Sequence, residues 1–271
     1  MIPTSRLSRE VRFSLPQSAD TEEILNTPRQ NTHVGWPTLG IHGGSTYRAI
    51  IEVEGVPDAR TGYLLGIDRI DAAVRDHALP RLLETRENGP LEMLEALKII
   101  HQAVTENLSV PPSATMLGNE PMTWWRIESS SMSTLIFRRR YEFSASHRLH
   151  LPELDDDANA ELFGKCSNPH GHGHNYEVEV QVACDRGQDP ICIHRLDEVV
   201  DHEVIDRFDH KHLNLDVDDF RDRVASVENI AARCVELLRE PILALRGAPR
   251  LDAVTVWETP RTACTVSNTS P

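Results

Sequence analysis

Apolar and polar residues alternate over two segments in the second half of the chain, and this alternation predicts two β-strands. In the segment 176–182, valines at every second position are separated by Glu and Gln. Phe143, Ala145 and His147 alternate in the same way over the segment 141–147. Because successive side chains of a strand point to opposite faces, each segment has one face suited to burial.

Apolar residues at helical spacing predict two helices after these strands. The first stripe consists of Leu196, Val199, Val200 and Val204, and the second of Val227, Ile230, Ala231, Cys234, Leu237 and Leu238. Ser226 suits the N-cap of the second helix, and Pro241 follows the main run of that helix. A further alternating segment, 252–258, predicts a closing strand.

The same order of patterns occurs in the first half of the chain, about 126–136 residues earlier. The resembling segments are 11–14 and 141–144, 47–53 and 176–182, 66–74 and 193–200, and 125–129 and 256–259. The matching helical stripes are Ile67, Ile70 and Val74, and then Leu94, Leu97, Ile100 and Val104. The prolines and glycine of 110–122 predict a loop, and 16–40 reads as a polar loop.

We therefore expect an α+β fold with two tandem units, residues 1–136 and 137–271. Each unit should form an antiparallel four-stranded sheet with two helices on one face. Open sheets of this kind often associate through their edges, so we expect a homo-oligomer.

Composition excludes several classes of function. The chain has 28 basic and 42 acidic residues and a net charge of -14, without the clustered basic face that nucleic-acid binding needs. No apolar run approaches the roughly 18 residues of a membrane span, and we expect no signal peptide. The five cysteines, an odd number without framework spacing, fit a reducing compartment, so we expect a cytoplasmic protein.

The segment 166–176, CSNPHGHGHNY, places one cysteine beside three histidines. His172 and His174 are two residues apart and share a face if the strand begins there, and His147 can face them from a neighbouring strand. Zinc accepts neutral imidazole readily, and three protein ligands with one open position is its catalytic arrangement. These residues predict a site for zinc or a similar metal.

Five separated motifs resemble the 6-pyruvoyltetrahydropterin synthase family, which also includes 6-carboxytetrahydropterin synthase. They are FSASHRLH (143–150), LFGKCSNPHGHGHNYEVEV (162–180), FDHKHLN (208–214), SVENIA (226–231) and VWET (256–259). The resemblance implies the tunnelling fold, or T-fold, in which trimers close a β-barrel, two trimers stack, and active sites lie where subunits meet. Residues 137–271 would then be the catalytic copy and 1–136 a degenerate one, and a trimer of tandem chains would build a pseudo-hexamer.

The resemblance also implies the site residues. The zinc ligands match His147, His172 and His174, and the catalytic groups match Cys166, Asp209 and His210. The pterin-binding residues match Glu258, with Glu228 and Ser226 nearby. The chain satisfies both family spacings after Cys166, so His170 remains an alternative to His174 as a ligand. Val227 departs from the Thr or Ser that the family often has before the helix glutamate.

The implied activity is that of a zinc-dependent lyase, which converts 7,8-dihydroneopterin triphosphate to 6-pyruvoyltetrahydropterin with loss of triphosphate. One alternative takes the same substrate to 6-carboxytetrahydropterin and acetaldehyde, a step towards queuosine. An alternative of another class is a non-catalytic pterin- or metal-binding protein.

The first copy lacks the catalytic residues. Gln17, Gly43 and Ser45 fall where the histidine ligands would be, and Leu83-Glu84 where Asp209-His210 would be. Glu92 and Glu128 stand opposite Glu228 and Glu258, and His42 has no second histidine beside it. We therefore expect the first copy to be non-catalytic.

Overall fold

The computed structural model of the chain describes residues 3–16, 44–87, 89, 91–120, 122–131, 134–185 and 191–268. The chain divides into two compact units, Met1–Phe137 and Arg138–Pro271, which are described separately. Nearly all of the polar loop expected at 16–40 lies outside the described residues. No helix within the described ranges is long and apolar enough to cross a lipid bilayer.

The first unit contains an antiparallel sheet of four strands in the order β1-β2-β3-β4. The strands are β1 (Ser5–Pro16), β2 (Gly44–Gly55), β3 (Pro112–Glu120) and β4 (Thr123–Glu128). The helices between β2 and β3 are α2 (Ile67–Ala72), the π-helical η1 (Ala73–Ala78), α3 (Leu79–Glu87) and α4 (Met93–Asn107). A short 3-10 turn, η2 (Ser129–Ser131), follows β4.

The loop predicted for residues 110–122 is wrong, because β3 occupies most of this segment. Pro112 is tolerated as the first residue of the strand, where its missing N–H is least costly. Glycine is favoured at position 118 of the strand because a Cβ atom there would come within 2.7 Å of the Trp124 ring. Both residue types usually indicate turns, but tertiary packing places them in the sheet.

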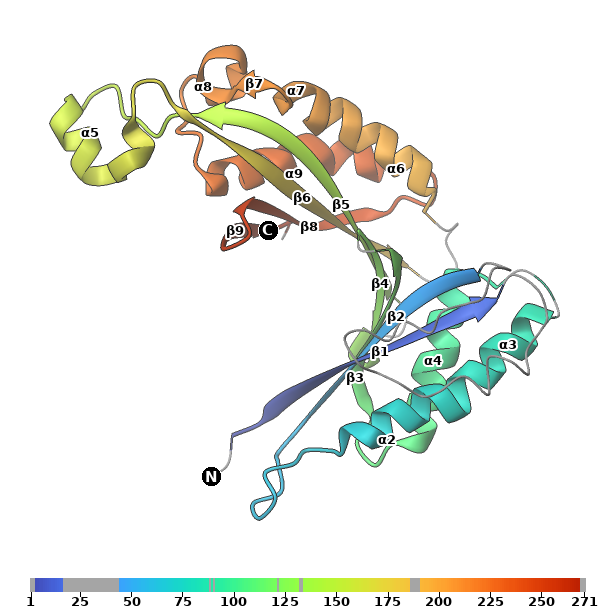
Figure 1. Ribbon diagram of the computed structural model, residues 1–271. Helices are drawn as coiled ribbons and strands as arrows, with labels where there is room; N and C mark the ends of the chain where they lie inside the picture. The colour runs from blue at the N-terminus through green and yellow to red at the C-terminus, as the bar shows by residue number, and fades with distance from the viewer. Residues whose placement is uncertain are drawn as a thin grey trace. The chain divides into compact units, whose positions relative to one another are not determined.

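The second unit contains an antiparallel sheet in the order β5-β6-β8-β9 (Figure 1). Its strands are β5 (Thr134–His147), β6 (His172–Asp185), β8 (Arg250–Thr259) and β9 (Thr262–Ser267), and the two-residue β7 (Lys211–His212) pairs parallel with β5. The first helical segment is α6 (Ile193–Val200), the π-helical η4 (Asp201–Ile205) and α7 (Asp206–Phe208). The remaining elements are α5 (Asp156–Phe163), η3 (Gly164–Ser167), α8 (Leu213–Asp216), η5 (Asp218–Phe220) and α9 (Val227–Leu243).

The core of the second unit lies between one face of the sheet and the helices. Tyr176, Val178, Val180 and Val182 alternate along β6 and are fully buried. The apolar stripe of α9, from Val227 to Ile242, is buried as well. Each fully buried side chain of this size contributes about 1.5–3 kcal/mol to folding. Because His172 and His174 continue the same two-residue period in β6, this burial also determines the face of the strand on which they lie.

The structure confirms the predicted N-cap of α9, but it differs from the sequence-based expectation at the end of this helix and in the presence of α5. The Ser226 side chain caps α9 by accepting a hydrogen bond from the backbone N–H of Asn229. The helix continues to Leu243, so Pro241 lies inside its last turn rather than beyond its end. Helix α5 was not predicted, although Asp155 caps it in the usual way by accepting from the backbone N–H of Ala158.

The two units share two local features, a bidentate arginine–aspartate pair and a π-helical segment. In the first unit, the Arg9 guanidinium bonds both oxygens of Asp71 at 2.8 and 2.7 Å, which joins β1 to α2. In the second unit, Arg139 bonds both oxygens of Asp197 at 2.7 and 3.0 Å, which joins β5 to α6. In each unit a π-helical segment, η1 or η4, follows the helix that carries this aspartate.

Candidate metal centre and active site

Three histidines from two neighbouring strands converge at one end of the second unit's sheet. His147 is the last residue of β5, while His172 and His174 are the first and third residues of β6. Their candidate ligand nitrogens all lie within 4.8 Å of one another. The Nε2 atoms of His147 and His172 are 3.0 Å apart. Donors this close together are suited to a single metal ion.

Two contacts of its Nδ1 atom fix the orientation of the His147 imidazole. Its Nδ1 atom lies 2.6 Å from the backbone carbonyl oxygen of Ala225 and 3.3 Å from the Tyr176 hydroxyl. A carbonyl oxygen can only accept, so Nδ1 carries the proton and Nε2 presents its lone pair to the other histidines. The imidazole is fully buried, and burial, ahead of the charges of the neighbouring histidines, lowers the pKa of His147 to about 4. Burial also lowers the pKa of His172.

The side chains present fit a metal ion. His174 Nε2 and His172 Nδ1 are both buried and have no hydrogen-bond partner. Four tetrahedral ligands of zinc are about 3.3 Å apart, given Zn–N bonds of about 2.0–2.1 Å, which is close to the separation of the His147 and His172 Nε2 atoms. His170 lies outside this cluster, since its side chain is exposed and its backbone N–H bonds the Asn168 side chain. The structure therefore brings His172 and His174, rather than His170, to His147.

Glu258 of β8 extends the cluster. Its Oε1 atom lies 3.3 Å from His147 Nε2 and 3.7 Å from His174 Nε2. The other two expected pterin-binding residues lie at the start of α9, where Ser226 is the N-cap and Glu228 is exposed. No hydrogen bond or ion pair joins Ser226 or Glu228 to the three histidines in the described part of the chain. Of these three expected pterin-binding residues, it is Glu258 that forms ion pairs with the histidines in the described structure.

Asp209 and His210 form a hydrogen-bonded pair at the edge of the sheet. His210 Nδ1 lies 2.7 Å from Asp209 Oδ2, while Asp209 Oδ1 accepts the backbone N–H of Ser144 at 2.8 Å. His210 has a φ of 56°, and its own N–H donates to the Ser144 carbonyl oxygen at 2.6 Å. The Ser144 N–H, followed by the His210 ring, holds the pKa of Asp209 below its usual range. The carboxylate therefore orients an exposed imidazole through two backbone anchors.

Cys166 lies in η3, and its thiol is free and partly exposed. Burial raises the pKa of Tyr176, and the charges of Glu258 and then Cys166 add to this increase. The thiol is therefore close enough to Tyr176 for its charge to act on the phenol.

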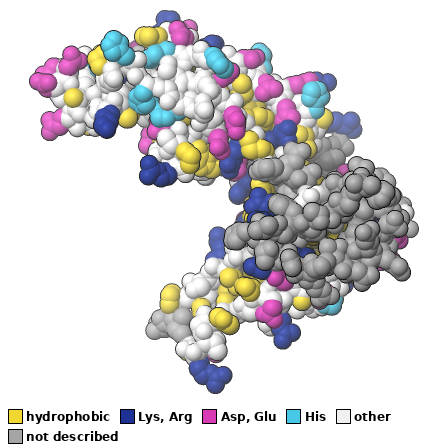
Figure 2. All heavy atoms as spheres, viewed as in Figure 1, with side chains coloured by type: hydrophobic (Ala, Val, Ile, Leu, Met, Phe, Trp, Pro, Cys, Tyr) yellow, Lys and Arg dark blue, Asp and Glu magenta, His cyan; other side chains and the backbone are white. Residues whose placement is uncertain are grey.

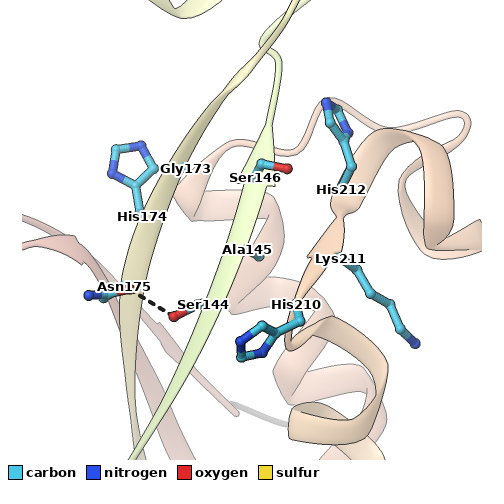
Figure 3. A pocket seen from close by; sticks show the side chains of 9 residues that line it. All are labelled: Ser144, Ala145, Ser146, Gly173, His174, Asn175, His210, Lys211 and His212. Atoms are coloured by element: carbon cyan, nitrogen blue, oxygen red, sulfur yellow. Dashed lines mark hydrogen bonds between the residues drawn. The ribbon is translucent and has the colours of Figure 1, made fainter.

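His210 forms no hydrogen bond or ion pair with the three histidines in the described part of the chain, although it lines one pocket together with His174. It borders a pocket with Ser144 and Asn175, whose side chains bond each other on the opposite face from Tyr176. Figure 3 shows the His174 ring pointing away from His210, across β6. No hydrogen bond connects Cys166 with His210 among the described residues. Within the described part of one chain, these two predicted catalytic groups are therefore not in direct hydrogen-bond contact.

Sequence reasoning missed the groups that support His147. Tyr176 continues the two-residue period of His172 and His174 and could have been recognised from that spacing. The Ala225 carbonyl oxygen could not, because a backbone acceptor 78 residues away leaves no signal in the sequence. His212, whose ring approaches Gly171, was also missed.

The first unit offers no such cluster within its described residues. Gln17, His42 and Gly43 lie outside the described residues, and so does the side chain of Ser45. Leu83 and Glu84 lie inside α3, at a point where the second unit leaves its helix for β7. The sequence pattern sets Glu92 opposite Glu228. In the structure Glu92 is the N-cap of α4, so it occupies the position that Ser226 has in α9.

Comparisons with known proteins agree with these features. Residues 136–269 match the family model described as 6-pyruvoyl tetrahydropterin synthase. The 6-pyruvoyl tetrahydrobiopterin synthase of Drosophila melanogaster is 38% identical over 135 residues, which cover 49% of this chain and 79% of that protein. The Homo sapiens protein of the same name is 44% identical over 99 residues, covering 34% of this chain and 66% of its own length.

Among solved structures, the 6-pyruvoyl tetrahydropterin synthase of Caenorhabditis elegans is similar to half of the chain. It is 32% identical, and the match covers 50% of this chain and 96% of that one with a TM-score of 0.44. The sequence identity to the Drosophila protein, over 79% of that protein's length, is sufficient to establish homology. The chain therefore belongs to the 6-pyruvoyl tetrahydropterin synthase family.

Proposed function

We propose that this protein is a zinc-dependent lyase that converts 7,8-dihydroneopterin triphosphate to 6-pyruvoyltetrahydropterin with loss of triphosphate. The observation that carries the proposal is the convergence of His147, His172 and His174 in a chain that belongs to this family. All relatives described above carry the name of this synthase. The three imidazoles that the described residues bring together leave a coordination position for a substrate oxygen, as in catalytic zinc sites.

The proposed roles follow from the position of each group. Zinc, when bound, would polarise the hydroxyl groups of the pterin side chain and make the adjacent C–H bonds more acidic. Cys166, partly exposed beside this site, acts as the general base that takes a proton from carbon. His210, oriented by Asp209, accepts and returns protons during the rearrangement. The side chain then loses triphosphate without any change in overall redox state.

We assign recognition of the pterin ring to Glu258. An ionised carboxylate has two acceptor oxygens, which match the adjacent amino and ring N–H groups of a pterin. Its contact with His147 and His174 supports a pterin ring bound close to the metal and the reacting side chain. Ser226 and Glu228, at the start of α9, complete the proposed binding set.

The separation of Cys166 from His210 supports a site shared between chains. Within one chain no hydrogen bond joins Cys166 to His210 among the described residues, and the His210 imidazole is exposed, with Asp209 as its partner. A second copy that presents its own Asp209 and His210 would complete the proton relay. The strands β1 and β9 each have a neighbour on one side only among the described strands, so both have edges available for pairing. We propose a homo-oligomer, with three tandem chains forming a pseudo-hexamer.

We also propose that the chain arose by duplication and that its first unit, residues 1–136, is a non-catalytic T-fold copy. The shared strand order, the paired Arg9–Asp71 and Arg139–Asp197 contacts, and the two π-helical segments support this. Two units that arrived at the same fold independently would have no reason to share these details. The first unit would then supply sheet edges and subunit walls.

Product analysis tests the proposed activity. The metal-loaded protein is incubated with 7,8-dihydroneopterin triphosphate, and the products are identified by mass spectrometry. Formation of 6-pyruvoyltetrahydropterin and tripolyphosphate supports the proposal. Release of acetaldehyde with a 6-carboxy product would instead identify a 6-carboxytetrahydropterin synthase. Binding of the substrate without turnover, in both wild-type protein and Cys166→Ala, would identify a non-catalytic pterin-binding protein.

A further inference from the structure

A cavity of about 530 Å³ in the second unit lies outside the site already described. Its basic lining residues are Arg148, His150, His212, Arg221 and Arg223. Only two acidic residues, Glu153 and Asp222, line it. This is a local excess of cationic groups in a chain whose net charge is -14. Figure 2 shows acidic side chains gathered over α5 instead.

The cavity adjoins the metal-binding histidines. Arg148 directly follows His147, and Pro169 lines the cavity three residues before His172. His212 borders both this cavity and the pocket beside His174. Its Nε2 atom would lie 2.9 Å from a Cβ atom at Gly171, so the ring packs against the turn that leads into His172. A ligand bound at the metal could extend into this space.

Arg148 provides a fixed cation. Its Nε–H donates to the Ser167 carbonyl oxygen at 2.8 Å, and its backbone N–H donates to the Asn214 side chain at 2.8 Å. Within the described residues, the ion pair of its guanidinium group is a 3.7 Å contact with Asp156, whose side chain is 89% exposed. The remaining guanidinium N–H groups are therefore available to an anion.

Arg221 and Arg223 provide cations whose present partners can be exchanged. Arg221 pairs with Asp218, whose side chain is 84% exposed, and Arg223 pairs with Glu236, which is 42% exposed. Exposed ion pairs of this kind contribute little free energy, so a more highly charged anion can replace the carboxylates. His212 Nδ1 is buried without a hydrogen-bond partner, which leaves one further polar atom for a ligand.

We propose that this cavity binds the triphosphate of the substrate, an inference that rests on the proposed function. A polyphosphate brings several negative charges into an acidic protein, and guanidinium groups neutralise them through paired, charge-assisted hydrogen bonds. The metal would hold the hydroxyls next to the reacting carbons while Arg148, Arg221 and Arg223 hold the leaving group. His150 and His212 donate further hydrogen bonds from the same wall.

Calorimetric titration with inorganic tripolyphosphate tests the assignment on the full-length, metal-loaded protein. The metal content is measured before and after each titration, because tripolyphosphate also binds metal ions. Wild-type protein should bind tripolyphosphate more tightly than orthophosphate. The double variant R221A/R223A should bind tripolyphosphate about tenfold or more weakly, since it loses two charged contacts. The control variant Arg239→Ala removes an exposed arginine of α9 outside the cavity and should bind like wild type.

Steady-state kinetics provides the second measurement. R221A/R223A should raise the KM for dihydroneopterin triphosphate without a matching loss of kcat. Equal tripolyphosphate affinity in wild type and R221A/R223A would overturn the assignment, as would a lack of preference for tripolyphosphate over orthophosphate. Binding that depends on Arg221 and Arg223 in a protein that turns over no pterin would support the polyphosphate site and refute the proposed lyase activity.

Discussion

The Nε2 atom of His147 lies 3.0 Å from the Nε2 atom of His172, although 25 residues separate them in the chain. His147 keeps its proton on Nδ1, where the Ala225 carbonyl oxygen accepts it. The facing pair can therefore share a proton from His172 or bind one cation through both lone pairs. The nearby Nε2 of His174, which is buried and has no hydrogen-bond partner among the described residues, favours the cation.

Replacing His172 by Ala should remove most of the bound metal. The change deletes one of three donors and leaves two imidazoles, which do not hold a divalent ion firmly. Metal content measured by mass spectrometry after gel filtration should fall from about one ion per chain towards zero. His170→Ala is the matched control, because His170 is exposed two residues earlier and should leave the metal content unchanged. Loss of metal in His170→Ala but not in His174→Ala would reverse the ligand assignment.

The stability of the metal-free protein should fall as the pH drops from about 6.5 to about 4. Burial lowers the pKa of His147 from 6.5 to about 4, so in this window the unfolded chain binds a proton that the folded chain does not. His147 therefore contributes stability above pH 6.5, and about 3 kcal/mol of it is lost by pH 4.

Urea unfolding at several pH values measures this contribution. The difference in unfolding free energy between the wild type and His147→Gln isolates it from the other titrating groups. A difference that stays constant from pH 7 to pH 4 would show that His147 titrates normally in the folded protein.

Asp209→Asn should lower kcat by about a hundredfold with little change in KM, which is the usual scale of a lost acid–base contribution. Asn at this position still accepts the Ser144 N–H but no longer favours the protonated imidazole of His210. Metal content should remain at the wild-type level. Asp206→Asn is the control, since Asp206 is exposed on α7. A normal kcat for Asp209→Asn would exclude the proposed relay.

The two arginine–aspartate pairs should have similar effects on stability. Asp71→Asn and Asp197→Asn each weaken a bidentate contact in a partly buried position and should cost about 1–2 kcal/mol of unfolding free energy. Arg6→Ala breaks a more exposed pair with Glu54 and should cost less than about 0.5 kcal/mol. Thermal and chemical unfolding would measure these costs. A large cost for Asp197→Asn alone would argue against equivalent roles in the two units.

The regular parts of the fold could be predicted from local periodicity. The alternation along β6 and the helical stripe of α9 are strong because each element buries one continuous face. The strand β3 escaped prediction because Pro112 and Gly118 indicate a turn locally, whereas the neighbouring strands and the Trp124 ring hold them in the sheet. In β3, tertiary packing therefore outweighs the local preference of proline and glycine for turns.

The histidine cluster was predictable for a similar reason. His172 and His174 share a face by strand geometry, and β6 begins at His172, which brings His174 rather than His170 into the cluster with His147. The separation of Cys166 from His210 was not predictable. It depends on the paths of η3 and of β7, which pairs with β5, and neither path leaves a periodic signal.

Reconstitution with zinc tests the central claim most directly. The protein is stripped of metal with a chelator and titrated with zinc, and turnover of 7,8-dihydroneopterin triphosphate is measured at each step. The account predicts no turnover without metal, recovery in proportion to added zinc, and a plateau at one zinc ion per chain. Turnover by the stripped protein, or a plateau at two ions per chain, would contradict a single catalytic site formed by His147, His172 and His174.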